Sequence, residues 1–182
     1  SAIGGDKLRH LKIFEAKERF VDELKKSELN YTIIRPNGFF SDIRDFLDMA
    51  KNGKVYLFGR GDFKLNPIHG EDLAKVCVDK ISSDENEITV GGPDMLSQNE
   101  LATLALNAWG KKPGIIIHLP DWIRKFTIWS LRTFTSSKTY GPIEFFLTLM
   151  AFDNKAEQFG THHLNDFFND EVERKIKTLN VK

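Results

Sequence analysis

A short apolar run over residues 31–34, Tyr-Thr-Ile-Ile, limits the possible folds of this chain more than any other segment. Its β-branched side chains and its abrupt end at Arg35-Pro36 predict a buried strand. The preceding segment, residues 6–26, is predicted to be an amphipathic helix, because its apolar residues recur mostly at helical spacing among Lys, Arg and Glu. A helix followed by a buried strand is typical of an α/β sheet.

Strands and helices are predicted to alternate along the rest of the chain. Residues 54–58, 63–68, 86–90 and 115–119 are expected to be extended. Helices are expected over residues 41–51, from residue 70, and over 97–109, 121–134, 142–152 and 164–178. Ser41 is predicted to cap the first of these helices, and Ser97 with Glu100 is predicted to form a capping box.

The composition excludes several classes of protein. The 26 Lys and Arg residues balance the 26 Asp and Glu residues, so no whole-molecule field attracts nucleic acid. Cys77 is the only cysteine, which rules out an internal disulfide and fits a reducing, cytoplasmic setting; we expect it to face inward from its helix as a small apolar residue. No stretch approaches the ~20 apolar residues of a membrane span. We therefore expect neither nucleic acid nor a membrane as a partner.

No motif for binding phosphate, activating a nucleophile or holding a metal is complete. A dinucleotide-binding turn needs closely spaced glycines between a strand and a helix; residues 4–5 lack the third glycine, and residues 59–61 precede an extended segment. There is no Gly-x-Ser-x-Gly elbow. The adjacent side chains of His162 and His163 diverge in any regular structure, and no partner spacing supports them as ligands, so a structural or capping role is predicted and no metal.

Two polar residues each leave two interpretations open. His69 stands just before the helix that begins at residue 70, so it either caps that helix or lines a cleft. Lys17 is either a solvated surface lysine or points toward a cleft beside the strand at residues 31–34.

The loop over residues 35–40 also has two interpretations: it either binds a ligand or is an ordinary packed loop. It follows the carboxyl end of a buried strand, which is where open α/β sheets place their ligands. Pro36 fixes the exit of the strand, Gly38 permits close approach to the backbone, and two phenylalanines offer a flat apolar wall. Ordinary loop packing explains the same residues.

Residues 14–18 and 24–40 resemble the atypical short-chain dehydrogenase/reductase superfamily. In those proteins a helix that bears the active-site lysine ends in L-x-x-S-x-L-x-Y-T-I-x-R-P, and the following loop passes under the nicotinamide. Residues 66–74 resemble their later I-H-x-x-D-x-A junction between a strand and a helix, and residues 140–146 and 159–164 are similar to the carboxyl-terminal substrate region of some members.

The resemblance implies the carboxyl-terminal portion of a doubly wound Rossmann-like domain over residues 1–94, followed by a mainly helical substrate-binding region over residues 95–182. The glycine-rich loop and the first strands of such a protein would lie upstream. We therefore expect a fragment, or a chain that pairs with its missing amino-terminal half or with a second copy, because parallel strands without neighbours expose unpaired edges. A homo-oligomer is one such arrangement.

The resemblance also implies site residues and a cofactor, NAD or NADP. Lys17 matches the catalytic lysine that binds the nicotinamide ribose, and the loop on the nicotinamide side matches Pro36, Asn37, Gly38 and Phe39. Substrate contacts are expected from four further side chains: Phe40, His69, Trp122 and Phe145. The aromatic content of the region after residue 115 suggests an apolar or aromatic substrate, although core packing uses such residues more often.

One departure from the family pattern bears on catalysis. The family tyrosine that acts as general acid or base lies four residues before the lysine, and Ile13 occupies that position here. His10 either substitutes for it or is an exposed helical histidine. The predicted function is the carboxyl-terminal part of an NAD(P)-dependent oxidoreductase; the alternatives are a non-catalytic NAD(P)-binding sensor, which the missing tyrosine favours, and a fragment with a structural role only.

Overall fold

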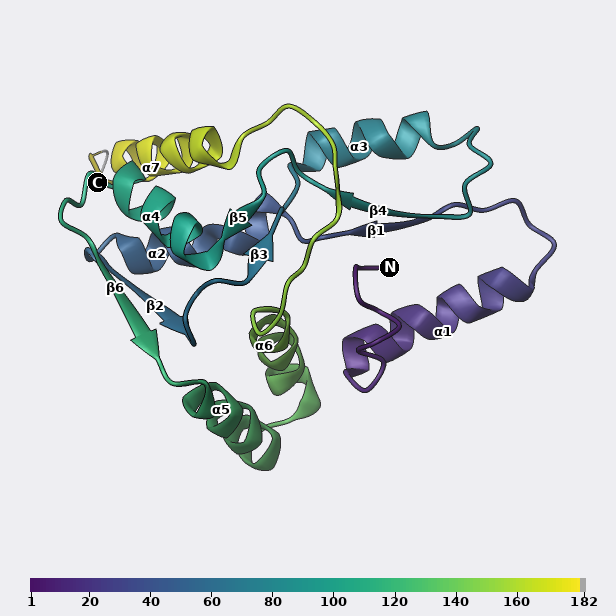
Figure 1. Ribbon diagram of the computed structural model, residues 1–182, viewed down its shortest axis with the longest axis horizontal. Coiled ribbons are helices and arrows are strands. Elements are labelled where there is room, and N and C mark those ends of the chain that lie inside the picture. The colour runs from purple at the N-terminus through teal and green to yellow at the C-terminus, as the bar shows by residue number, and fades with distance from the viewer. Residues whose placement is uncertain (181–182) are drawn as a thin grey trace.

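The computed structural model describes residues 1–180, which form an α/β fold built on short, mainly parallel strands (Figure 1). The strands are β1 (Ile33–Pro36), β2 (Lys54–Phe58), β3 (Lys64–Leu65), β4 (Glu87–Gly91), β5 (Leu96–Ser97), β6 (Ile115–Leu119) and β7 (Glu157–Gln158). The helices are α1 (Lys12–Lys26), η1 (Phe40–Ile43), α2 (Arg44–Ala50), α3 (Gly70–Asp79), α4 (Gln98–Ala108), α5 (Asp121–Phe134), α6 (Ser137–Leu149) and α7 (Leu164–Asn180). The predicted α/β class is confirmed.

The sheet that positions the candidate site has the strand order β1-β4-β7, and all its pairings are parallel. Figure 1 shows α1 and α3 on opposite sides of the β1–β4 pair, and two residues of β1, Ile33 and Arg35, are buried there. The chain start follows the free side of β1: the Ser1 amino group donates to the Ile34 carbonyl at 3.3 Å, and the Ile3 amide donates to the Pro36 carbonyl at 3.2 Å.

Two smaller sheets complete the described part of the chain. β2 and β6 pair in parallel, and β3 and β5 pair antiparallel. The main hydrophobic core lies between α2, β2, α4 and α7, and its largest fully buried side chains include Phe40, Leu47, Leu101 and Phe168. This core takes residues from both sides of the boundary expected at residue 94, which stays a prediction.

A separate small core joins α1 to α6. Leu8, Leu11 and Phe14 are buried there, and the Phe14 ring lies 5.2 Å from the Phe145 ring, measured between centroids. Because α1 carries Lys17 and α6 carries Phe145, this contact fixes the distance between two of the predicted site residues.

Several predicted boundaries are wrong. The first helix begins at Lys12 instead of residue 6, because Gly4 has a left-handed φ of 73° and residues 3–10 form turns that bury Leu8 without being helical. Ser41 caps no helix: it lies inside η1, and the Asp42 carboxylate accepts the Phe39 amide at 3.1 Å instead.

The carboxyl-terminal helices also differ from prediction in detail. α6 begins five residues earlier than expected, so Pro142 lies inside it and removes one backbone donor from the helix. α5 has the predicted bounds. None of the helices within residues 1–180 is long and apolar enough to cross a membrane.

Two side-chain predictions are settled by packing. Cys77 was expected to face inward, but it is exposed, because the buried side of α3 carries Asp72 and Val76 instead. Ser97 accepts the Glu100 amide at 3.2 Å and the Glu100 carboxylate accepts the Ser97 amide at 2.7 Å, which confirms the capping box.

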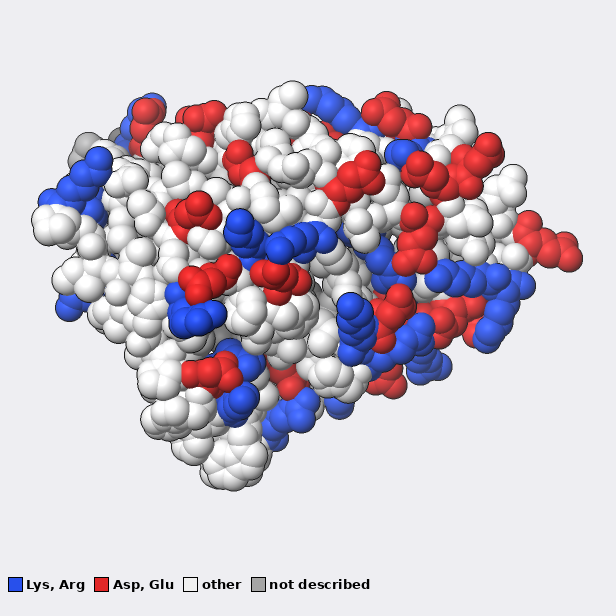
Figure 2. Space-filling view, in the orientation of Figure 1, with Lys and Arg blue, Asp and Glu red and all other residues white. Residues whose placement is uncertain are grey.

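Charged side chains cover the surface in both signs. Figure 2 shows acidic and basic residues next to one another over the face in view, most densely around α1. There the Arg9 guanidinium donates to both carboxylate oxygens of Asp22, at 2.7 and 2.8 Å.

Candidate functional site

A cavity of about 640 Å³ lies where the loop after β1 meets α1 and α6. Its volume is typical of sites for small molecules. The walls are mostly apolar and include Phe39, Phe145 and Leu149, while Lys17 and Asp45 contribute charged groups. The cavity therefore combines a large apolar surface with a few polar groups, as ligand sites commonly do.

Lys17 is exposed on α1, one residue before the fully buried Glu18. The helix buries Phe14, Glu18 and Val21 on one side, which leaves Lys17 at the edge of that side and at the rim of the cavity. The cleft interpretation of Lys17 is therefore compatible with its exposure, since the side chain borders both solvent and the cavity.

The loop over residues 36–39 is fixed by its backbone. The Asn37 amide donates to the Val90 carbonyl at 2.9 Å, and the Ile68 amide donates to the Gly38 carbonyl at 3.0 Å. Gly38 has a φ of 89°, a conformation that L side chains rarely adopt, and no heavy atom lies within 4 Å of the place a Cβ would take. The glycine therefore leaves its face of the loop open for a ligand to approach the backbone.

The buried side-chain amide groups of Asn66 and Asn37 fix the position of the same loop. Asn66, which is fully buried, accepts from the Asn37 side chain at 2.6 Å and from the Ala156 amide at 3.0 Å. Its own amide group donates to the carbonyls of Ala156 at 3.0 Å and Gly92 at 3.2 Å. The Asn37 side chain also donates to the Asn154 carbonyl. Asn37 thus lines the cavity, but both hydrogen-bond donors of its side chain position the loop and are not free for a ligand.

A buried ion pair links α1 to β1. The Arg35 guanidinium donates to both carboxylate oxygens of Glu18, at 2.6 and 3.0 Å, and also to Glu87. Glu18 is fully buried and Arg35 is 3% exposed. The hydrogen bond from Arg35 outweighs the effect of burial and lowers the pKa of Glu18 to about 2, with a further contribution from Ser1. The pair fixes the helix that carries Lys17 against the strand that leads into the loop.

The low pKa of Glu18 predicts a loss of stability in acid. Its pKa is 4.5 in an unfolded chain and about 2 in the folded one, so the stabilisation is complete above pH 4.5 and is lost as the pH falls toward 2. We expect Glu18 to contribute about 3 kcal/mol to this loss. Urea unfolding at a series of pH values measures it. Glu18→Gln should flatten the curve in that window, whereas Glu23→Gln, on the exposed side of α1, should not; identical curves for Glu18→Gln and the wild type would contradict the expectation.

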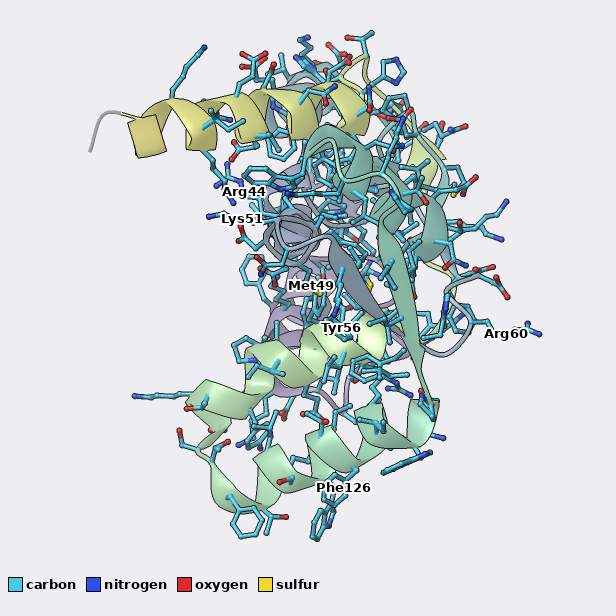
Figure 3. All side chains as sticks on the ribbon, turned by 90° about the vertical axis from the view of Figure 1, so that its left-hand side faces the viewer. Arg44, Met49, Lys51, Tyr56, Arg60 and Phe126 are labelled. Atoms are coloured by element: carbon cyan, nitrogen blue, oxygen red, sulfur yellow. The ribbon has the colours of Figure 1, made fainter. Side chains whose placement is uncertain are left out.

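The cavity brings together six of the predicted site residues: Lys17, Pro36, Asn37, Gly38, Phe39 and Phe145. Three others do not line it. Phe40 is 2% exposed and packs into the main core, with its ring 5.4 Å from that of Phe167. Trp122 is 65% exposed on α5. Phe126, one turn further along the same helix, is also exposed, and Figure 3 shows it pointing away from the rest of the molecule.

His69 is the third residue outside the cavity. Its Nδ1 accepts the Glu71 amide at 3.3 Å, so the capping interpretation is confirmed. His10 is exposed, as its second interpretation expected, but it lies on a turn before α1 instead of in a helix. Ile13 is half-buried and has no proton to transfer.

The sequence did not indicate the groups that complete the cavity. Asp42 and Asp45 place two carboxylates at its edge, and Phe146 and Met150 add to the apolar wall from α6 and its end. No motif marks these residues, because their place depends on how α2 and α6 pack around the loop.

The known proteins that are similar to this chain are longer than it is, and each alignment covers only part of both proteins. No family model matches the chain. It is 30% identical over 132 residues to divinyl chlorophyllide a 8-vinyl-reductase of Zea mays, an alignment covering 66% of this chain and 33% of the relative. Festuclavine synthase II of Penicillium roqueforti is 27% identical over 139 residues, covering 74% of this chain and 45% of that protein. The chain thus spans about a third of the length of the first of these relatives.

A solved structure shares the fold. A nucleoside-diphosphate-sugar epimerase from Staphylococcus aureus superposes with a TM-score of 0.59 and 18% identity, over 86% of this chain and 57% of the other. The chain therefore shares the Rossmann-type α/β fold of this epimerase, and its similarity to the vinyl-reductase agrees with the resemblance to the atypical short-chain dehydrogenases/reductases.

Proposed function

We propose that this chain forms the nicotinamide side of an NAD(P)-dependent oxidoreductase site and the cavity that holds its small-molecule substrate. One observation carries the proposal: Lys17 and the loop over residues 36–39 come from different elements and border the same mostly apolar cavity. A lysine ammonium donates hydrogen bonds to ribose hydroxyls, and the loop offers the flat apolar surface that a nicotinamide ring covers.

The described residues fit one end of the dinucleotide only. The open space at Gly38 accommodates a planar ring against the backbone, and Lys17 lies at the rim where the attached ribose would sit. Within residues 1–180 no glycine-rich turn opens a helix to receive the diphosphate, so that end requires residues supplied from elsewhere. When bound, the cofactor would supply the hydride, and this chain would orient the ring and exclude water from its substrate face.

The cavity wall supports a proposal for the substrate class. Its apolar lining favours a substrate with a large apolar surface, and the maize relative is named for reducing a vinyl group of a chlorophyllide. We propose an activated carbon–carbon double bond on such a substrate as the first class to test, with a carbonyl as the second.

Ile13 supports a second candidate function, a sensor that binds the dinucleotide without turnover. The position that would need a proton donor carries a hydrocarbon side chain. Oxidation of NADPH by the purified protein, followed in the presence of divinyl chlorophyllide and a set of apolar ketones, separates the two. Binding of the cofactor without turnover on any of them would exclude the oxidoreductase and leave the sensor.

Lys17→Met tests the cofactor proposal directly. We expect it to weaken NADPH or NADH binding at least about tenfold, because a charged donor to the ribose is lost. Calorimetric titration of the full-length protein measures the affinity. Lys12→Met, an exposed lysine on the same helix, should leave it unchanged. Equal affinity for the Lys17→Met variant and the wild type, or no binding of either dinucleotide, would overturn the proposal.

A further inference from the structure

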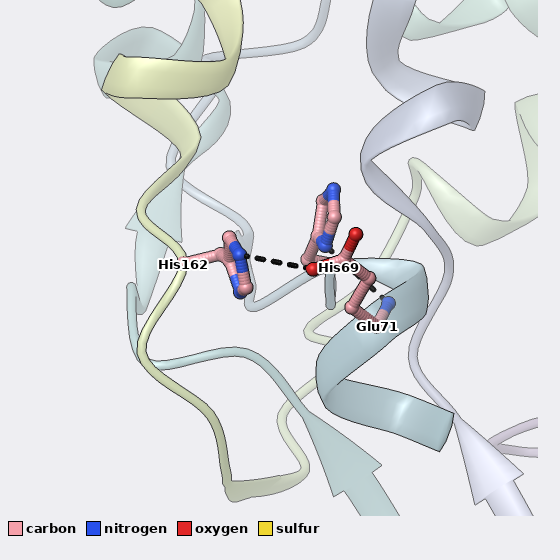
Figure 4. Close-up of side chains that lie close together, drawn as sticks. All are labelled: His69, Glu71 and His162. Atoms are coloured by element: carbon pink, nitrogen blue, oxygen red, sulfur yellow. Dashed lines mark hydrogen bonds and ion pairs between the residues drawn. The ribbon is translucent and has the colours of Figure 1, made fainter. Parts of the chain in front are cut away.

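Three side chains from two distant segments of the chain lie close together at the amino end of α3. His69 and Glu71 come from the start of that helix, and His162 comes from the segment that leads into α7 (Figure 4). One potential ligand atom from each lies within 4.8 Å of the other two. The imidazole rings of His69 and His162 stack with centroids 4.3 Å apart, and His162 Nε2 lies 3.5 Å from the Glu71 carboxylate. We propose that these residues form a binding site for a zinc ion.

The buried carboxylate of Asp72 determines which nitrogen of His162 is available. Asp72 is 1% exposed and accepts from the amides of Thr161 and His162, both at 3.0 Å, and lies 2.9 Å from His162 Nδ1. A carboxylate oxygen only accepts hydrogen bonds, so the 2.9 Å contact makes Nδ1 the donor, and Nε2 keeps its lone pair.

This arrangement is the one that metal-bound histidines use. Such a histidine almost always donates its second ring N–H to a carboxylate or carbonyl, which fixes the ring and makes the ligating nitrogen more basic. Here Nε2 faces the Glu71 carboxylate, another acceptor. Two acceptors that face one another attract a shared cation.

The segment that carries His162 is held close to Asp72. Gly160 has a φ of 84°, and a Cβ there would overlap the Asp72 carboxylate. The backbone therefore reaches Asp72 only because residue 160 has no side chain. This close approach positions the following amides and the His162 ring.

The donor set fits zinc. Two neutral imidazoles and a carboxylate are common zinc ligands, and an open fourth position is taken by water. With Zn–N bonds of about 2.0–2.1 Å, tetrahedral ligand atoms lie about 3.3 Å apart. The present separations of up to 4.8 Å close to that value through rotation of the exposed Glu71 and the half-buried imidazoles. Whichever ring nitrogen of His69 binds the ion, Nδ1 gives up its 3.3 Å hydrogen bond from the Glu71 amide.

The neighbouring His163 provides a matched control. Its Nδ1 lies 2.7 Å from Asp94, so its ring is held by a different carboxylate. It is the same residue type and the next residue in the chain, but it is more exposed than His162 and has a different carboxylate partner.

The test uses the tag-free protein, freed of metal, with Zn²⁺ alone as the probe in calorimetry and Co²⁺ alone in visible absorption. We expect one ion per chain and the intense bands of tetrahedral Co²⁺, displaced by Zn²⁺. His162→Gln and Glu71→Gln should each weaken binding at least about tenfold. His163→Gln should bind as the wild type does.

The measurement remains decisive if one variant is unstable. Glu71 is exposed and its side chain serves no core contact, so Glu71→Gln leaves the fold intact, which circular dichroism checks. In the wild type, Zn²⁺ should shift the ring ¹⁵N resonances of His69 and His162 but not those of His163. Absence of binding, equal binding by Glu71→Gln and the wild type, or shifts confined to His163 would each overturn the proposal.

Discussion

Replacing Arg35 by methionine is expected to lower the free energy of unfolding by about 3–5 kcal/mol, because it leaves a fully buried carboxylate without its cation. Glu18 receives two hydrogen bonds from Arg35 and lies at 0% exposure, so water cannot take over the role of the guanidinium. Methionine retains most of the apolar length of the side chain, so the loss reports the charge and the hydrogen bonds rather than a cavity.

Urea unfolding, with the slope checked for two-state behaviour, measures this loss. Arg60→Met is the control: Arg60 lies 3.0 Å from the Asp62 carboxylate, but both side chains are exposed, so its removal should change stability by at most about 1 kcal/mol. The double variant Arg35→Met/Glu18→Met should recover much of the loss, since it leaves no unpaired charge. A loss below about 1 kcal/mol for Arg35→Met would show that the pair does not hold α1 to β1.

Asn66→Leu is expected to destabilise the protein by about 3–5 kcal/mol, because Asn66 uses both donors and both acceptor positions of its amide on buried partners. Leucine has similar volume but offers none of these hydrogen bonds. The Ala156 amide, the Gly92 carbonyl and the Asn37 side chain would then lose their partner inside the chain.

Thermal and urea unfolding measure the effect, and Asn52→Ala serves as control. Asn52 is exposed in the turn between α2 and β2, and its substitution should stay within about 0.5 kcal/mol. Asn66→Leu should also weaken dinucleotide binding in the protein that remains folded, since Asn37 and the loop over residues 36–39 lose their support. Wild-type stability of Asn66→Leu would mean that the network does not position the loop.

Both predictions test how buried polar residues position the candidate site. Neither Arg35 nor Asn66 reaches into the cavity as its ligand-facing group; one aligns the helix of Lys17, and the other aligns the loop that contains Gly38. The geometry of the cavity therefore depends on buried polar groups, whose partners must all be present for the arrangement to be stable.

The sequence by itself determined the elements whose cause is local. The β-branched run indicated a strand, which spans Ile33–Pro36 instead of residues 31–34, and Ser97 with Glu100 indicated a capped helix start, because each depends on residues within a few positions of one another. The cap at His69 was one of two interpretations that the sequence left open. The resemblance around Lys17 and the loop over residues 36–39 likewise rests on a continuous stretch of chain.

Only the tertiary structure decided which distant side chains meet. Phe145 reaches the cavity whereas Trp122 does not, because α6 packs on α1 while the outer side of α5 stays open to solvent. His162 meets Asp72 across ninety residues of chain. Periodicity records which side of an element is apolar, but not which element it packs against, since burial and hydrogen-bond pairing are properties of two segments at once.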